Sequence, residues 1–198
     1  MNLHTMVPFR TDKNLGRAYN EAMALIPEGD WAVFLDHDAM FTTPKWHAQI
    51  TEAIEAFPAA GAFVGCTNRI ASPWQRVGGN DRTHDIAWHR KLGAERAKLR
   101  TLLDISQTKG WGGVCFAVSK ATWRAVGPFA DGLGCVDHSL HFALQRAGKP
   151  VYMIEALYLF HWRHFGEPDP TSSAPKAPDC PCRGPEIEPT VRVTLPPC

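Results

Sequence analysis

The stretch Trp31-Ala32-Val33-Phe34-Leu35-Asp36-His37-Asp38-Ala39-Met40-Phe41 decides the fold that we predict for this chain. Five apolar residues with a β-branched and aromatic bias end abruptly in Asp-His-Asp. This pattern is typical of a buried parallel strand that delivers carboxylates to its C-terminal edge. Open α/β sheets bind their ligands at that edge. The sequence therefore predicts an α/β fold with a ligand site at the end of this strand.

Asp36 and Asp38 are the first candidate ligands. Side chains two residues apart lie on the same side of an extended backbone, so both carboxylates can address one hard cation. No neighbouring Lys or Arg pairs them, and unpaired carboxylates behind an apolar run are costly. His37 is expected to point to the opposite side as a packed or hydrogen-bonded side chain. The alternative interpretation is that Asp38 only caps a helix while Asp36 is solvated.

Composition favours one domain and argues against two classes of partner. The chain has 198 residues, 44% of them hydrophobic, and a formal net charge of +1, so a nucleic-acid-binding surface is not indicated. No apolar run is long enough for a membrane span, and no secretory leader is evident, so we expect a cytoplasmic protein. The six cysteines are then expected to be free thiols. A zinc site from Cys180 and Cys182 is the alternative. The oligomeric state is not indicated.

Strand and helix patterns alternate along residues 1–166. We predict strands at 3–9, 31–35, 62–67, 114–118 and 151–160, and helices at 15–26, 44–57, 86–103, 120–126 and 136–147. The first strand, helix and strand form a parallel unit with a right-handed crossover. Residues 68–81 are predicted to be a long loop. Residues 167–198, rich in proline and small polar residues, are predicted to be a flexible tail.

Several ordered blocks resemble the nucleotide-sugar-dependent glycosyltransferases of the GT-A fold, especially the inverting family two. The blocks are Asn14-Leu15-Gly16-Arg17-Ala18-Tyr19-Asn20, Phe34-Leu35-Asp36-His37-Asp38, Gly112-Gly113, Gly127-Pro128-Phe129 and Val136-Asp137-His138, followed by the region of His161. The resemblance implies a single-domain, Rossmann-like α/β fold with a mainly parallel sheet flanked by helices. It also implies transfer of a sugar from a nucleoside-diphosphate sugar to a hydroxyl of a glycan or other acceptor, with inversion.

The resemblance implies a role for each acidic residue. Asp38 would be the main ligand of Mn²⁺ or Mg²⁺, while Asp36 would contact the ribose or reach the metal through water. A histidine would complete the coordination sphere, with His161 favoured and His164 in reserve, and an imidazole tilts the choice toward manganese. The alternative is two surface histidines. Asp137 would be the general base, although Val136 replaces the glutamate usual before it. The alternative is that Asp137 caps its helix.

The remaining candidates concern donor and acceptor binding. Pro8, Arg10, Lys13, Asn14, Asn20 and Asp36 are candidate donor-binding residues. Gly112 and Gly113 would let backbone approach a sugar, and Trp111 and Trp74 are candidate stacking residues for the acceptor. The alternative for Trp111 is a core position. The strand and helix that the family usually has between its first strand and the asparagine-containing helix are absent. Two rival functions are a metal-dependent phosphohydrolase or nuclease, and a non-catalytic carbohydrate-binding relative.

Overall fold

A mixed sheet of eight strands forms the centre of the computed structural model, which describes residues 1–77, 83–162 and 187–196. The strand order is β1-β2-β6-β4-β7-β5-β8, and β3 pairs with β7 beside this path. The strands are β1 Leu3–Met6, β2 Trp31–Leu35, β3 Ala39–Phe41, β4 Ala62–Thr67, β5 Thr101–Asp104, β6 Cys115–Ser119, β7 Val151–His161 and β8 Arg192–Thr194.

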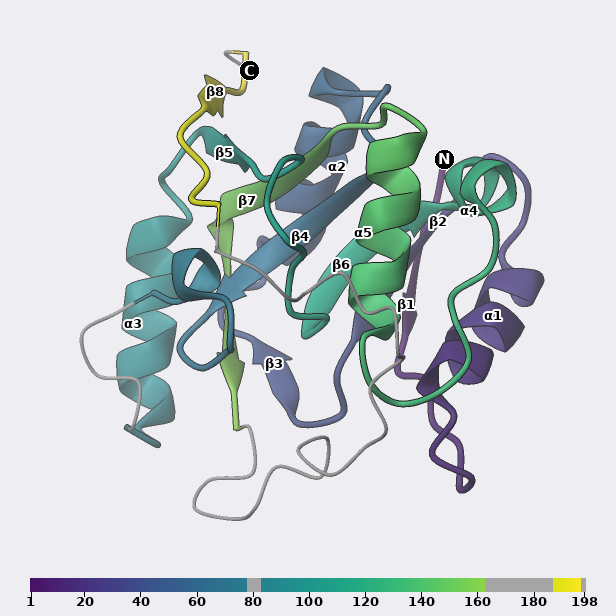
Figure 1. The fold of residues 1–198 in the computed structure, drawn as a ribbon. Helices are drawn as coiled ribbons and strands as arrows, with labels where there is room; N and C mark the ends of the chain where they lie inside the picture. The colour runs from purple at the N-terminus through teal and green to yellow at the C-terminus, as the bar shows by residue number, and fades with distance from the viewer. Residues whose placement is uncertain (78–82, 163–186, 197–198) are drawn as a thin grey trace.

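Helices cover both faces of this sheet, with α5 in front of it and α2 behind it in Figure 1. None of the helices in the described ranges is long and apolar enough to cross a bilayer. The α-helices are α1 Leu15–Leu25, α2 Trp46–Ala56, α3 Ile86–Arg96, α4 Lys120–Val126 and α5 Val136–Arg146, and a short 3₁₀ turn covers Pro73–Gln75.

Strand β2 shows how the sequence builds a core on each face. Ala32 and Phe34 join a cluster with side chains of α1 and α5, whereas Trp31 and Val33 join a cluster with side chains of α2. Successive side chains of a strand point to opposite faces, so a strand that is apolar at every position must be covered on both. The continuous apolar run therefore requires the helical layers on either side.

The single α/β domain is confirmed, but its sheet is not mainly parallel. Among the strands in the described part of the chain, the parallel pairs are β1 with β2 and β4 with β7. Strand β6 runs antiparallel to both of its neighbours, and β5 runs antiparallel to β7. Apolar runs indicate burial but carry no information on strand direction, so this prediction was wrong.

Two predicted segments differ from the structure in their element type. The helix predicted over 86–103 ends at Arg96, and Thr101–Asp104 form strand β5. The predicted flexible tail includes β8, which pairs with β5, and Leu195, which is buried. Residues 167–186 and 197–198 of that tail lie outside the described part. Strand β3 was also missed, because three residues give too short a pattern.

The topology brings three strand ends to one edge of the sheet. Strands β2, β4 and β7 run in the same direction, because β6 is antiparallel to both β2 and β4 while β4 and β7 are parallel. Strand β3 folds back from the end of β2 and pairs with the last residues of β7, placing Ala39 opposite His161. Residues that follow β2 therefore meet the end of β7.

Candidate metal centre and substrate cavity

Asp36, Asp38 and His161 form the one cluster of possible metal ligands found in the described part of the chain. One ligand atom from each lies within 4.8 Å of the other two. The two aspartates follow β2, and the histidine is the last residue of β7. Residues 36 and 161 come together because their strands end at the same edge and β3 joins them. The structure thus brings together three of the four predicted metal ligands.

The two aspartates converge for a different reason than the sequence suggested. The backbone turns after Asp36, whose carbonyl accepts a 3.1 Å hydrogen bond from the amide of Ala39, so the segment is not extended. The amide of Trp162 donates to the carbonyl of Asp38 at 2.9 Å and fixes the turn to β7. Because of this turn, His37 is exposed and contributes to a cavity wall, so of the two predicted alternatives the packed side chain is wrong.

His161 is oriented by bonds at both of its ring nitrogens. Nδ1 lies 2.7 Å from the carbonyl oxygen of Arg69, and since a carbonyl can only accept, Nδ1 carries a hydrogen. Nε2 lies 3.3 Å from Oδ1 of Asp38. Nε2 thus points at a carboxylate, a position from which both atoms can bind one cation. A metal-binding histidine normally has this arrangement, with its other nitrogen donating to a carbonyl.

The carboxylates differ in their electrostatic environments. Burial raises the pKa of Asp36 to about 6, against the opposing charge of His161 and with added repulsion from Asp38 and Asp137. Burial also acts to raise the pKa of Asp38, but the hydrogen bond and charge of His161 outweigh it, so this pKa is lowered. A bound cation would relieve the repulsion that acts on Asp36.

Two adjoining cavities open beside this cluster. The larger, about 520 Å³, is lined by all three cluster residues, and the smaller, about 250 Å³, is lined by Asp36 and Asp137. Asp36 and Gly113 line both. The walls also include apolar side chains that sequence analysis did not single out, because nothing distinguishes them from core residues: Leu15, Tyr19 and Leu133 in both cavities, and Ile70 in the larger one.

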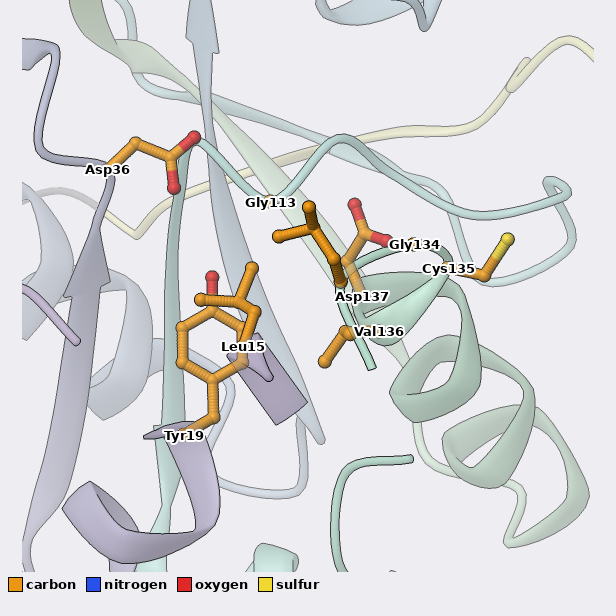
Figure 2. A pocket seen from close by; sticks show the side chains of 9 residues that line it. Leu15, Tyr19, Asp36, Gly113, Gly134, Cys135, Val136 and Asp137 are labelled. Carbon is orange, nitrogen blue, oxygen red and sulfur yellow. The ribbon is translucent and has the colours of Figure 1, made fainter. Parts of the chain in front are cut away.

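Asp137 faces Asp36 across the smaller cavity, and Figure 2 shows their carboxyl groups on either side of it, with the Tyr19 hydroxyl pointing up between them. Burial raises the pKa of Tyr19, and the charges of Asp36 and Asp137 raise it further, so both carboxylates act on this hydroxyl. Asp137 lies in the first turn of α5, whose N-cap is Cys135 in a left-handed conformation. Asp137 is therefore not the N-cap residue, although its carboxylate accepts a 2.9 Å hydrogen bond from the amide of His138 in the same turn.

Three predicted donor-binding residues of the first loop line the larger cavity: Pro8, Arg10 and Lys13. The guanidinium of Arg10 is held by two carboxylates, with contacts of 2.8 Å to Asp12 and 2.7 Å to Glu21. Its charge is therefore compensated within the protein. Lys13 forms no ion pair with a described residue, so it offers a positive charge at the cavity wall.

Asn14 and Asn20 do not line either cavity. Asn14 caps α1 by accepting from the amide of Arg17 at 2.9 Å, and it also accepts from the amide of Gly132 at 2.9 Å. The carboxamide of Asn20 binds the amide and the carbonyl of Phe129, both at 2.9 Å. These asparagines fasten α1 to the segment that precedes α5, which gives them a structural role, and their contact with a donor stays a prediction.

The predicted acceptor-binding residues divide in the same way. Gly112 and Gly113 line the larger cavity, and a β-carbon on Gly113 would lie 3.4 Å from Asp137. Trp111 is fully buried in the core, and Trp74 packs against the same core, so neither lines a cavity. The backbone approach predicted at the glycines fits the structure, and the burial of Trp111 rules out stacking on its ring. Stacking on Trp74, which is only half-buried, stays a prediction.

Two buried carboxamides near the site were missed by sequence analysis. Gln75 accepts from the amide of Gly112 at 2.7 Å and donates to the carbonyls of Gly65 and Gly112, which fixes the glycine wall of the cavity. Asn68 binds the backbone of His161. Both lie in the predicted long loop, where polar residues are common, so no sequence signal separated them from solvated loop residues.

The remaining candidates fall outside the site or outside the described residues. His164, Cys180 and Cys182 lie in the range 163–186, so the structure neither supports nor opposes them as ligands. Within the described part, Cys66 and Cys115 are free thiols. Cys135 is only half-buried and lines the smaller cavity.

Comparison with known proteins does not identify a family for this site. No family model matches the sequence, and no curated protein matches it.

Proposed function

We propose that this protein is a metal-dependent glycosyltransferase with a GT-A-like architecture, which transfers a sugar from a nucleoside-diphosphate sugar to a hydroxyl acceptor with inversion. The observation that carries the proposal is the convergence of Asp36, Asp38 and His161 at the wall of a cavity of about 520 Å³. The second support is the resemblance of individual sequence blocks to GT-A glycosyltransferases.

The donor set fits a divalent cation. Two carboxylates and one imidazole within 4.8 Å offer hard oxygen ligands and one nitrogen, a combination that favours Mn²⁺ over Mg²⁺. The hydrogen bond from Nδ1 of His161 to Arg69 leaves Nε2 directed at Asp38, as a ligand would be. When bound, the cation would stabilise negative charge on the departing diphosphate.

The chain's own groups supply the remaining requirements. Asp137 would accept the proton of the acceptor hydroxyl. As it does so, the hydroxyl oxygen would bond to the anomeric carbon, and the bond from that carbon to the diphosphate would break. The placement of Asp137 across the smaller cavity from Asp36 suits attack from the side opposite the leaving group. Lys13 would meet the phosphates, and Gly113 would leave room for the sugar beside Asp137.

The test is a comparison of Asp38→Ala with Glu55→Gln. Glu55 is an exposed carboxylate of α2 that lines neither cavity, so it controls for the loss of one charge. Asp38→Ala should remain folded and lose Mn²⁺-dependent transfer or donor hydrolysis across a panel of nucleoside-diphosphate sugars, while Glu55→Gln keeps both. Full activity in Asp38→Ala would eliminate the metal role.

The same assay separates the rival functions. Release of inorganic phosphate or cleavage of DNA without sugar transfer would favour a hydrolase. Two-metal hydrolysis uses more ligands than the single three-residue cluster in the described part of the chain. Calorimetric binding of glycans with no binding of nucleotides would instead favour a carbohydrate-binding module.

A further inference from the structure

The carboxamide of Asn68 binds both backbone groups of His161. Its Oδ1 accepts from the amide of His161 at 2.8 Å, and its Nδ2 donates to the carbonyl of His161 at 3.3 Å. Asn68 is 0% exposed, so water cannot replace these bonds. The side chain lies where the β4 ladder stops, because Thr67, the last residue of β4, pairs with Leu159. The carboxamide thus continues the ladder to the final residue of β7.

The orientation of this carboxamide follows from its partners. Oδ1 of Asn68 also accepts from the hydroxyl of Thr67 at 3.1 Å. The opposite orientation would direct an NH₂ group at the amide hydrogen of His161, so the hydrogen-bond network selects one orientation. The acceptor and the donor of Asn68 are thus both matched to the backbone of His161.

The next residue holds the ring of the same histidine. The carbonyl of Arg69 accepts from Nδ1 of His161 at 2.7 Å. Asn68 and Arg69 are adjacent, so displacement of the Asn68 side chain would also move the carbonyl that selects the tautomer of the ring. One short segment after β4 therefore fixes the backbone, the ring orientation and the protonated nitrogen of His161.

We propose that Asn68 is a positioning residue for His161, which holds Nε2 toward Asp38 and thereby sets the affinity of the site for a divalent cation. This inference rests on the proposed metal site. It predicts that loss of the carboxamide lowers Mn²⁺ affinity by about 10- to 100-fold, the range found when the partner that orients a ligand is removed. Asn68 itself is not a ligand in this proposal.

Gln49 provides a matched control. It is also a buried carboxamide, and it donates to a β7 backbone carbonyl, that of Ala156, at 3.0 Å. It lines neither cavity, and its hydrogen bond goes to a residue that lies several positions before His161 in β7. Substitution of Gln49 should therefore cost stability without changing the ring of His161.

The experiment measures the ring nitrogens of His161 by ¹⁵N NMR, and Mn²⁺ binding by calorimetry, in the unaltered protein, Asn68→Ala and Gln49→Ala. We expect the unaltered protein and Gln49→Ala to show His161 protonated at Nδ1, and Asn68→Ala to show a mixture of tautomers and weaker Mn²⁺ binding. Asn68→Asp keeps the acceptor for the His161 amide, so it should retain most of the original ring spectrum.

The outcomes separate this inference from the proposed function. If Asn68→Ala does not fold, Asn68→Ser takes its place, since a serine side chain is too short to bind both backbone groups. An unchanged ¹⁵N spectrum of His161 in the folded variant overturns the positioning role, whether or not the Mn²⁺ affinity changes. A changed spectrum in a protein that never binds Mn²⁺ keeps the positioning role and removes the proposed metal function.

Discussion

His161 and His141 are both buried, and each places one ring nitrogen 2.7 Å from a backbone carbonyl, yet their second nitrogens have opposite surroundings. Nε2 of His161 faces Asp38 at the cavity. Nδ1 of His141 is buried without a hydrogen-bond partner, and the ring packs edge-on against Trp111. The carbonyl that anchors His141 belongs to Thr108.

The difference shows that a fixed tautomer alone does not make a histidine a ligand. In both residues a carbonyl determines which nitrogen carries the hydrogen. Only at His161 does the remaining nitrogen meet carboxylates that can share a cation. At His141 the same anchor serves the core, and burial lowers the pKa of His141 to about 4.

The largest expected effect is on metal affinity. His161→Ala should weaken Mn²⁺ binding by on the order of 100-fold or more, because it removes a ligand and not merely the partner that orients one. His141→Ala should leave the affinity unchanged and lower the free energy of unfolding. Calorimetry and urea unfolding of both variants test this, and equal losses of affinity would contradict the division between the two histidines.

The next effect is the response of stability to acid. The folded-state pKa of His141, about 4, lies below the ordinary value of 6.5, so protonation favours unfolding. The contribution of neutral His141 to the free energy of unfolding is therefore present above pH 6.5 and is lost as pH falls toward 4. Between pH 7 and pH 5 it should decrease by about 2 kcal/mol.

His141→Gln provides the control for this acid response, because glutamine can still donate to Thr108 but does not titrate. Asp36 acts in the opposite direction in the metal-free protein, since its raised pKa makes acid stabilising. The difference between the unaltered protein and His141→Gln, measured by urea unfolding at several pH values, removes that contribution. Parallel curves for the two proteins would contradict the prediction.

A smaller effect is expected at the glycine wall. Gln75→Leu leaves the amide of Gly112 without its acceptor and should lower the free energy of unfolding by about 1 to 2 kcal/mol. Hydrogen exchange at Gly112 should accelerate in this variant. Gln49→Leu, a buried carboxamide on α2, should lose comparable stability without changing exchange at Gly112. Equal exchange in both variants would remove the role assigned to Gln75.

The smallest effect sharpens the account of Asp36. With a pKa of about 6, Asp36 must lose a proton before it can bind a cation at lower pH. Mn²⁺ affinity should therefore be about tenfold higher at pH 7 than at pH 5, as expected for one proton released with that pKa. Asp36→Asn should flatten this dependence, and a flat profile in the unaltered protein would place the ligand proton elsewhere.

Much of the site could be predicted because it lies in local patterns. Asp36 and Asp38 follow an apolar run, His161 ends another, and Gly112 and Gly113 precede a third. The backbone hydrogen bonds of Asn14 and Asn20 were not predicted, because a carboxamide that binds a ligand and one that binds backbone look alike in sequence. Trp111 was ambiguous for a similar reason, since the sequence does not state which face of a ring is covered.

The sequence by itself determined the α/β class, a core on each face of the sheet, and carboxylates at a strand end, because burial and side-chain alternation are properties of neighbouring residues. Only the tertiary structure decided strand direction, the turn at Asp36 and the partners of each buried carboxamide. These depend on pairs such as Asn68 with His161, which are 93 positions apart. A hydrogen bond across that distance leaves no periodic trace in the chain, so it becomes visible only once the strands are packed.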